Sequence, residues 1–499
     1  MQDSGASSAA VTPRGAGRRW RAPGAGVITT LAGGAVLLAL HARNALDSDE
    51  GVILNGAWNL LHGRALYTDF FEFLPPGSFY AVLAAWKVFG SSYWVAKALG
   101  LAALALAAFG IDRIARLLVA QRGLGVAPHA LTAAPLLFCL FSGYLPTINH
   151  NTFHLPVAVW SAFFAIRGIQ AASWRGCALA GLLCGGSAWF LQHRAALMAV
   201  ATLAVLLLHA CRRPGANWRW CCAAYVLGVA APVGAMAVLW APPVLFDHLI
   251  VFPATRYLEV NRVDRTLIAC AATFALGAAW LLRRTLDAPA AMLLALLGAL
   301  LLTALQRPDL GHVTSALWPL LCLLPRLAAV AATTWLARLG RTWIAMGMAA
   351  LPLPLVAMVF ANPTLYFSDW SRRHPALQYV RQHCEQAGAL YAGPFAPGLY
   401  YETGMLNPTR YSVLLPKFNT DAQFRDALRD LQLRRPRCAI TNHRLADKFG
   451  STRDTVVDAY LAANYDVVFE ARNRQVWMAR APRPIPPVAP TPAAPVANP

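Results

Sequence analysis

Long runs of apolar residues, separated by short polar segments, make up most of the chain up to about residue 361. Most of the runs have about 15 to 22 residues, close to the roughly 20 that an α-helix needs to cross a bilayer. The pattern therefore predicts an all-α polytopic membrane domain at 25–361 with about eleven transmembrane helices. We expect these helices at 26–43, 98–111, 130–145, 155–166, 176–190, 195–210, 220–241, 266–282, 288–305, 313–330 and 342–361.

After residue 361 the pattern changes to that of a small mixed domain at 362–480. Apolar residues at helical spacing alternate there with short β-branched or aromatic segments, which is typical of an α/β fold. The composition of residues 1–24 and 481–499 indicates disordered tails. In the small domain we expect helices at 375–388, 420–433 and 452–465, strands at 389–394 and 437–442, and a hairpin formed by 466–472 and 474–480.

Basic residues are spread between the apolar runs rather than gathered in one patch. Of the 499 residues, 57% are hydrophobic and only 13% are charged, and the formal net charge is +20. This distribution argues against a nucleic-acid partner and for a role in topology, because cytoplasmic loops of membrane proteins are rich in Arg and Lys. Arginines occur in every second connection, at 14–21, 113–122, 167–175, 212–219, 283–284 and 338–341.

This alternation predicts that the amino terminus is cytoplasmic and that the small domain is extracytoplasmic. It requires the segment 74–90 to be an interfacial or re-entrant helix, because a full span there would place Arg113 on the outer side. Cys384 and Cys438 of the small domain either form a disulfide on the outer face or stay reduced. The same face then holds the connections at 44–97, 144–154, 191–194 and 306–312.

The segment 46–80 holds the densest group of carboxylates in the membrane domain. Ionisable groups at a bilayer boundary are costly and usually have a function. Asp49 and Glu50 are our catalytic candidates, because a carboxylate held there can act as a general base toward a hydroxyl or amine acceptor. Asp47 is expected to be a helix N-cap. The group comprises Asp47, Asp49, Glu50, Asp69 and Glu72, whereas 73–246 contains a single carboxylate, Asp112.

Polar side chains from the other outer connections are expected to join these carboxylates in a single site. Arg194 and Arg307 carry the charge that binds a phosphate, and Gln192 adds a neutral donor. In the alternative interpretation, Arg194 reaches the membrane interface and Arg307 pairs with Asp309. The complete set of these side chains is His150, Gln192, His193, Arg194, Arg307, Asp309 and His312.

Glu72 and His312 are candidate ligands of a divalent metal ion. Glu72 precedes a Pro-Pro-Gly turn, whose prolines stiffen the chain and fix the direction of the carboxylate. Oxygen and nitrogen donors together suit a divalent cation. In the alternative, Glu72 belongs to a surface loop, so a metal cofactor is an open prediction. His150, His193 and Asp309 are expected only to line the site.

The layout of the chain and its motif at 47–80 resemble the GT-C superfamily of polyprenyl-phosphate-dependent glycosyltransferases. One helix is followed by an outer loop with an Asp-Glu pair, an amphipathic stretch and YTDFFEFLPPGSFY, and then by many spans and a mixed carboxyl-terminal domain. The chain is most similar to the branch that contains protein O-mannosyltransferases and the aminoarabinose transferase of lipid A. A weaker motif match covers 306–319, QRPDLGHVTSALWP.

This resemblance implies a membrane enzyme that transfers a sugar from a polyprenyl-phosphate donor to an envelope lipid, glycan or protein, at the outer face of a bacterial cytoplasmic membrane. It implies that Asp49 is the catalytic carboxylate, that Glu50 is its motif partner and that Glu72 corresponds to an acid that contacts a metal ion in some relatives. Relatives often carry Lys at the position of Leu74, so an arginine of another outer connection is expected to make that phosphate contact. An inverting displacement follows as a hypothesis.

Two other functions stay open. A transporter or flippase for a lipid-linked saccharide also carries polar residues along its substrate path, and an inactive relative would serve as an assembly partner. The enzyme is favoured because the polar residues gather on one face, whereas alternating access needs a site near the membrane midplane. The sequence has no Walker, GxGxxG, HExxH or GxSxG motif, which argues against nucleotide-driven pumps and hydrolases of those classes.

Overall fold

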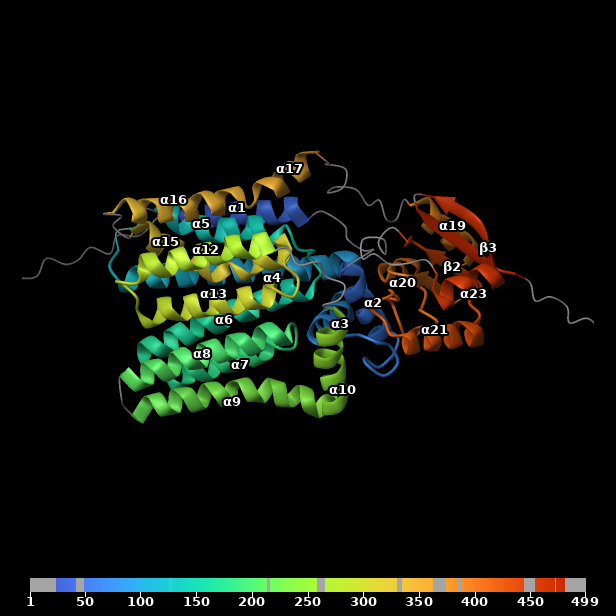
Figure 1. Ribbon diagram of the computed structural model, residues 1–499, viewed down its shortest axis with the longest axis horizontal. Helices are drawn as coiled ribbons and strands as arrows, with labels where there is room; N and C mark the ends of the chain where they lie inside the picture. Colours follow the sequence, from blue (N-terminus) through green and yellow to red (C-terminus); the bar gives the residue numbers. More distant parts are fainter. Residues whose placement is uncertain are drawn as a thin grey trace, which may run out of the picture.

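A computed structural model of the protein (Figure 1) consists of a helical bundle with a small α/β domain beyond one end of it. Asp47 lies outside the residues that the structure describes, and so do both predicted tails except for residue 24. The described residues are 24–41, 49–124, 126, 128–212, 216–257, 265–329, 334–361, 374–384, 388–443, 454–471 and 473–480.

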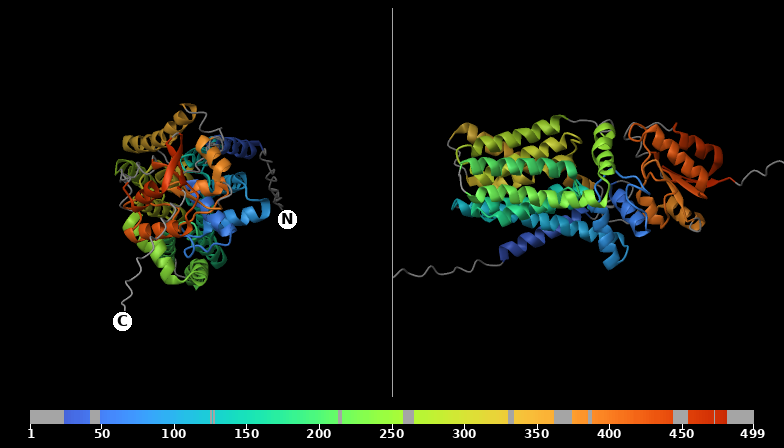
Figure 2. Two further views of the ribbon diagram at one scale, coloured as in Figure 1. Left: turned by 90° about the vertical axis from the view of Figure 1, so that its right-hand side faces the viewer. Right: turned by 90° about the horizontal axis from the view of Figure 1, so that it is seen from below.

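The bundle helices run side by side along the longest axis of the molecule (Figures 1 and 2). The largest apolar core lies among them and includes Ile111, Leu297 and Trp318. The helices are α1 (Gly24–His41), α4 (Tyr93–Gln121), α5 (Pro128–Ser142), α6 (His150–Ala171), α7 (Trp174–Ser187), α8 (Gln192–Arg212), α9 (Ala216–Leu239), α12 (Arg265–Leu282), α13 (Ala288–Ala304), α14 (Leu310–Ala316), α15 (Trp318–Ala329), α16 (Trp335–Ala350) and α17 (Leu353–Ala361).

Each of the eleven predicted apolar segments coincides with one of these helices or with a pair of them. Among the described residues, however, only 5 helices are long and apolar enough to cross a membrane, or up to 6 if α14 and α15, bent by 53°, form one span. The others are shorter than the roughly 20 residues of a typical span; α13, for example, has 17 residues. The chain is a multi-pass membrane protein, and the count of eleven spans is not confirmed.

Shorter helices lie across the end of the bundle that faces the α/β domain (Figure 1). One of them, α3, occupies the predicted interfacial segment and has 13 residues, too few to cross a bilayer. The chain from Asp247 to Tyr257 includes two π-helical turns, a geometry that is often found at functional sites. These elements are α2 (Asp49–Leu61), α3 (Gly77–Phe89), α10 (Pro242–Phe246), η1 (Asp247–Val251) and η2 (Pro253–Tyr257).

The α/β domain contains a four-stranded sheet of order β1-β2-β4-β3. Strand β1 is parallel to β2, and the predicted hairpin β3–β4 joins the sheet through antiparallel pairing of β4 with β2. A disulfide joins Cys384 to Cys438. The elements are α19 (Pro375–Cys384), β1 (Leu390–Gly393), α20 (Gly398–Thr403), α21 (Asp421–Arg434), β2 (Cys438–Thr441), α23 (Val456–Asn464), β3 (Tyr465–Ala471) and β4 (Arg474–Ala479).

Glycines allow α7 and α9 to pack backbone against backbone. A Cβ atom at Gly181 would clash with the carbonyl oxygen of Tyr225, and one at Gly185 would clash with that of Val229. Small residues spaced four apart permit this close approach in membrane helices, where van der Waals contact replaces the hydrophobic effect between helices.

The α/β domain docks on the loop between α2 and α3. The backbone N–H of Phe71 donates to the carbonyl oxygen of Arg410 at 2.8 Å, and Arg64 donates to that of Asn407 at 3.0 Å. Aromatic rings pack on both sides of this loop: the ring of Phe71 lies 5.7 Å from that of Tyr411 in the domain and 4.9 Å from that of Phe252 beside η1. The loop that carries Glu72 is therefore held between the bundle and the domain.

Candidate functional site

Glu50 is buried at the start of α2 and is held by four donors. Its Oε1 lies 2.8 Å from Nζ of Lys97 and accepts hydrogen bonds from the backbone N–H groups of Thr147 at 3.1 Å and Ile148 at 3.4 Å. Its Oε2 accepts a hydrogen bond from the Tyr93 hydroxyl at 2.8 Å. These contacts join the start of α2 to α4 and to the connection before α6.

Asp49 precedes Glu50 in the first turn of α2 and has a different environment. Its side chain is half-buried, and it forms no hydrogen bond or ion pair with any part of the chain that the structure describes. A carboxylate without a partner in the protein is open to contact by an acceptor group, and a carboxylate can act as a general base toward a hydroxyl or amine.

The connection 144–150 links Glu50 to the other predicted site residues. Thr147 and Ile148 contact Glu50 in its middle, and the side chain of Asn149 caps α6 at its end. At its beginning, the carbonyl oxygen of Tyr144 lies close to Gly311, where a Cβ atom would be 3.2 Å from it. The starts of α2, α6 and α14 are thereby held at one end of the bundle.

Arg194 lies in the first turn of α8 and is 1% exposed. Nη1 of Arg194 donates to Oγ of Ser315 at 3.0 Å, and Nη2 donates to the carbonyl oxygen of His312 at 3.2 Å. Its Nε has no hydrogen-bond partner, and no carboxylate among the described residues forms an ion pair with it. A buried guanidinium with an unpaired donor is costly unless an anion binds to it.

Arg307, Asp309 and His312 form a second charged group beside Arg194. Nε of Arg307 lies 2.9 Å from Oδ2 of Asp309, and Nδ1 of His312 lies 2.8 Å from Oδ1. Burial by itself would raise the pKa of Asp309, but the hydrogen bonds and charges of His312 and Arg307 outweigh it and lower that pKa. Because ionised Asp309 only accepts, Nδ1 of His312 donates to it and Nε2 is the other polar atom of the ring.

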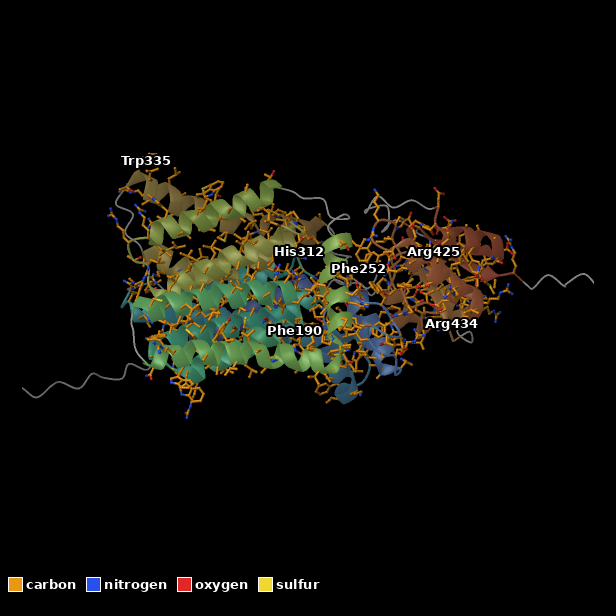
Figure 3. All side chains as sticks on the ribbon, turned by 60° about the horizontal axis from the view of Figure 1, so that its bottom comes forward. Phe190, Phe252, His312, Trp335, Arg425 and Arg434 are labelled. Atoms are coloured by element: carbon orange, nitrogen blue, oxygen red, sulfur yellow. A yellow bond between two sulfur atoms is a disulfide. The ribbon has the colours of Figure 1, made fainter. Side chains whose placement is uncertain are left out.

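His150 and His193 complete this polar group. Electrostatic interactions link His150 at the start of α6 with His193 and Arg194 at the start of α8 and with His312 in α14. Figure 3 shows His312 toward the end of the bundle that faces the α/β domain. Gln192 is turned to another partner, because its Nε2 donates to the carbonyl oxygen of Leu249 at 2.7 Å. The side chain of Gln192 thus joins the start of α8 to η1, and its amide donor is engaged there instead of beside Arg194.

Glu72 lies apart from this group, at the contact with the α/β domain. It is 3% exposed, and Oε1 accepts from the hydroxyl of Ser412 at a long 3.5 Å. Burial raises the pKa of Glu72 to about 8, and the hydrogen bond from Ser412 opposes this only in part. Nδ1 of His248 lies 2.7 Å from the backbone carbonyl oxygen of Glu72 and so helps to hold the loop. The surface-loop interpretation of Glu72 is wrong, because its carboxyl group is buried.

The predicted metal ligands do not form a set. Glu72 contacts Ser412, whereas His312 contacts Asp309. Within the described ranges, no group of three or more His, Cys, Asp or Glu side chains is arranged to hold a metal ion. Among the described residues, Glu72 and His312 therefore do not belong to one ligand set for a divalent ion.

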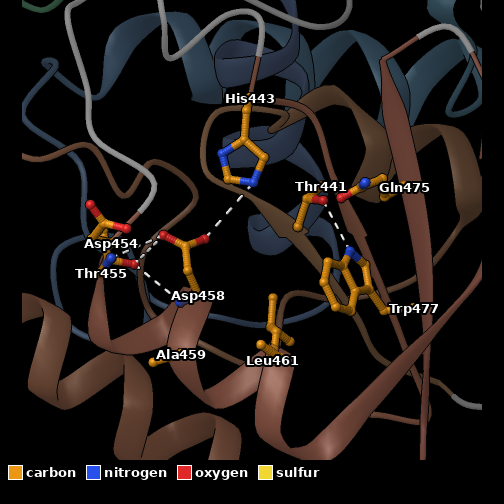
Figure 4. A pocket seen from close by; sticks show the side chains of 10 residues that line it. Thr441, His443, Asp454, Thr455, Asp458, Ala459, Leu461, Gln475 and Trp477 are labelled. Atoms are coloured by element: carbon orange, nitrogen blue, oxygen red, sulfur yellow. Dashed lines mark hydrogen bonds and ion pairs between the residues drawn. The ribbon is translucent and has the colours of Figure 1, made fainter.

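A cavity of about 430 Å³ opens elsewhere, in the α/β domain, beside α23 and the ends of β2 and β4 (Figure 4). Nε2 of His443 lies 3.9 Å from Oδ1 of Asp458, and Nε1 of Trp477 donates to the hydroxyl of Thr441 at 3.0 Å. Asp454 also lines the cavity, and no described Arg or Lys does. This lining does not suit a phosphate group, and none of the predicted site residues belongs to it.

Sequence reasoning missed Lys97, Ser315 and Ser412. Lys97 carried a usable signal, because a single Lys within a long apolar helix usually has a buried partner. Ser315 and Ser412 carried none, since their roles depend on which carbonyl and carboxyl groups the fold brings beside them.

Comparison with known proteins identifies the fold. No protein-family model matches the chain, and no curated protein matches it in sequence. The crystal structure of ArnT from Cupriavidus metallidurans bound to undecaprenyl phosphate matches with a TM-score of 0.60 at 13% identity, over 92% of this chain and 98% of that chain. The same protein in the apo state matches with a TM-score of 0.58 at 14% identity, over 90% and 97%.

The chain has the GT-C fold of ArnT. The resemblance that the motif at 47–80 indicated is therefore confirmed at the level of the fold. An oligosaccharyltransferase from Archaeoglobus fulgidus also matches, with a TM-score of 0.48 at 10% identity over 84% of this chain and 70% of that chain. That likeness is too weak to support an argument about this protein. At these identities the GT-C fold is established, and the activity has to be argued from the site.

Proposed function

We propose that this protein is a membrane glycosyltransferase that takes its sugar from a polyprenyl-phosphate donor. The observation that carries the proposal is Arg194, a buried guanidinium with an unpaired Nε and no carboxylate partner among the described residues. A lipid phosphate would supply the missing anion and would accept a charge-assisted hydrogen bond. The GT-C fold supports this assignment, since the ArnT structure with that fold contains undecaprenyl phosphate.

The reaction that fits the site is a single displacement. Asp49 takes the proton of the acceptor hydroxyl or amine, and the freed oxygen or nitrogen forms a bond to the anomeric carbon. The bond from that carbon to the phosphate oxygen breaks, and the phosphate leaves with the electron pair. Arg194 stabilises the charge that develops on the leaving oxygen. Attack from the side opposite the phosphate inverts the anomeric centre.

The Asp-Glu pair divides its work between two residues in this proposal. Glu50 is held by Lys97, Tyr93 and two backbone N–H groups, so no lone pair on it is obviously directed at a substrate. It fixes the start of α2 and thereby the direction of Asp49. Asp309 has a similar positioning role for His312 and Arg307.

The outer face of the membrane is the proposed location of the site. Disulfides persist in oxidising compartments, so the bond between Cys384 and Cys438 favours an extracytoplasmic α/β domain. The site lies at the end of the bundle on which that domain docks, through contacts such as Phe71 to Arg410. An envelope lipid, glycan or protein is the corresponding acceptor class.

The test is transfer of label from a panel of radiolabelled polyprenyl-phosphate sugars in membranes that contain the wild type, Asp49→Asn or Asp421→Asn. Asp421 is the matched control, because it is also a carboxylate in the first turn of a helix but lies in α21. We expect wild type and Asp421→Asn to transfer label and Asp49→Asn, at equal protein level, to lose about 100-fold or more of the rate. If Asp49→Asn transferred label as fast as the wild type, Asp49 would not be the general base. Retained stereochemistry in the product would reject the single displacement.

A further inference from the structure

A basic pocket lies at the end of the bundle opposite to Asp49. The starts of α4 and α6 are at the Glu50 end, so their last residues, Gln121 and Ala171, lie at the other end. The pocket is formed there by the ends of α4 and α12, by α15 and by the start of α16, and it measures about 410 Å³. Figure 3 shows Trp335, the first residue of α16, at this end and far from Arg425 of the α/β domain. Its lining includes Arg122, Trp280, Leu281, Arg283, Arg284 and Arg326.

Positive charge in this pocket is only partly balanced. Asp287 is its neighbouring carboxylate, and it pairs with Arg326 at 2.7 Å and with Arg122 at 3.1 Å. Arg283 and Arg284 are exposed, and neither forms an ion pair within the described residues. Four guanidinium groups therefore meet a single carboxylate.

Apolar groups lie directly beside this charge. The guanidinium of Arg283 stacks over the ring of Trp280, 4.2 Å from its centroid, and Leu281 belongs to the buried core below. A free phosphate would use only the guanidinium groups. A phospholipid would use both features, with its phosphate on the arginines and its acyl chains along the apolar wall.

We propose that this pocket binds the phosphate headgroup of an anionic phospholipid. Basic pockets between transmembrane helices at the membrane surface bind such headgroups. The simpler explanation is that these arginines serve topology alone and have no bound partner. Arg175 offers a control within the same chain. Its guanidinium lies over the ring of Trp174, 5.4 Å from the centroid, at the same end of the bundle, but Arg175 does not line the pocket.

The experiment uses the purified full-length protein in neutral detergent, with native mass spectrometry and thermal unfolding as readouts. Phosphatidylglycerol, phosphatidylcholine and inorganic phosphate are added separately to wild type, to the double variant R283Q/R284Q and to the control R167Q/R175Q. Both pairs are mostly exposed arginines at one end of the bundle, so neither double variant is expected to unfold.

We expect phosphatidylglycerol to bind the wild type and R167Q/R175Q and to raise their melting temperatures, and to bind R283Q/R284Q roughly 30-fold more weakly. Phosphatidylcholine and inorganic phosphate are expected to have little effect. Equal binding of phosphatidylglycerol to all three proteins would overturn the proposal. Inorganic phosphate that binds as well as the lipid would reject the lipid as the occupant. The test measures lipid binding and melting temperature and does not measure sugar transfer, so its outcome is independent of the proposed function.

Discussion

Nζ of Lys97 lies 2.8 Å from Oε1 of Glu50, and both side chains are buried. The carboxylate next in sequence, Asp49, has no such partner in the described part of the chain. Two adjacent acids of one motif thus have opposite environments. In the proposed function, Asp49 is the general base and Glu50 holds the helix that carries it.

Removal of Lys97 should destabilise the fold. Lys97→Met leaves Glu50 buried without its cation, and breaking a buried ion pair from one side costs about 3 to 5 kcal/mol. Lys87→Met is the control, since Lys87 is exposed on α3. Denaturant unfolding in detergent measures both, and the double variant Lys97→Met with Glu50→Gln should recover part of the loss. Wild-type stability of Lys97→Met would show that the pair does not support the fold.

Stability should fall as the pH rises past the ordinary pKa of a carboxyl group, because of Glu72. Burial raises its pKa from 4.5 to about 8 in the folded protein. The folded state therefore holds a proton that the unfolded state has released, so stability declines between about pH 4.5 and 8. Glu72→Gln stays neutral at every pH and should remove this decline, which is on the order of 5 kcal/mol for a pKa shift of this size. Melting temperatures from pH 5 to 9 test it, and identical slopes for both proteins would contradict it.

The contact of α7 with α9 should not tolerate a methyl group. At Gly181 a Cβ atom would meet the backbone carbonyl of Tyr225, which cannot rotate away, whereas at Gly186 the nearest atom is a side-chain carbon of Val157 at 3.9 Å. Gly181→Ala should cost about 1 to 3 kcal/mol through overpacking. Gly186→Ala should be neutral or slightly stabilising, because Ala is the better helix former. Similar melting temperatures for the two variants would mean that the helices are not packed so closely.

Local pattern was enough to predict most elements of the fold. The hairpin of β3 and β4 follows from two alternating segments around a short turn, and α21 begins at Asp421 after the N-cap residue Thr420, which forms a capping box. Helix α20 was missed because its six residues, GLYYET, contain a glycine and two tyrosines and show no helical period. The number of spans was not predictable in this way, since apolar helices such as α13 have lengths at the margin of a bilayer.

At the candidate site, the sequence could not predict which distant segments contact one another. The alternation of arginines predicted that the connections with Asp49, His150, Arg194 and His312 share one face, and the structure brings the starts of their helices to one end. The sequence could not predict that the side chain of Gln192 would donate to Leu249, or that Glu72 would be buried against Ser412. Those partners lie 57 and 340 positions away in the chain.

Binding of undecaprenyl phosphate to purified wild type, Arg194→Gln and Arg167→Gln tests the central claim most directly. Gln removes a buried charge that has no ion-pair partner, so Arg194→Gln should fold without ligand, while Arg167 is exposed on another part of the bundle. We predict that Arg194→Gln binds about 10- to 100-fold more weakly than the wild type, and that Arg167→Gln binds normally. A folded Arg194→Gln protein that binds undecaprenyl phosphate as tightly as the wild type would contradict the account.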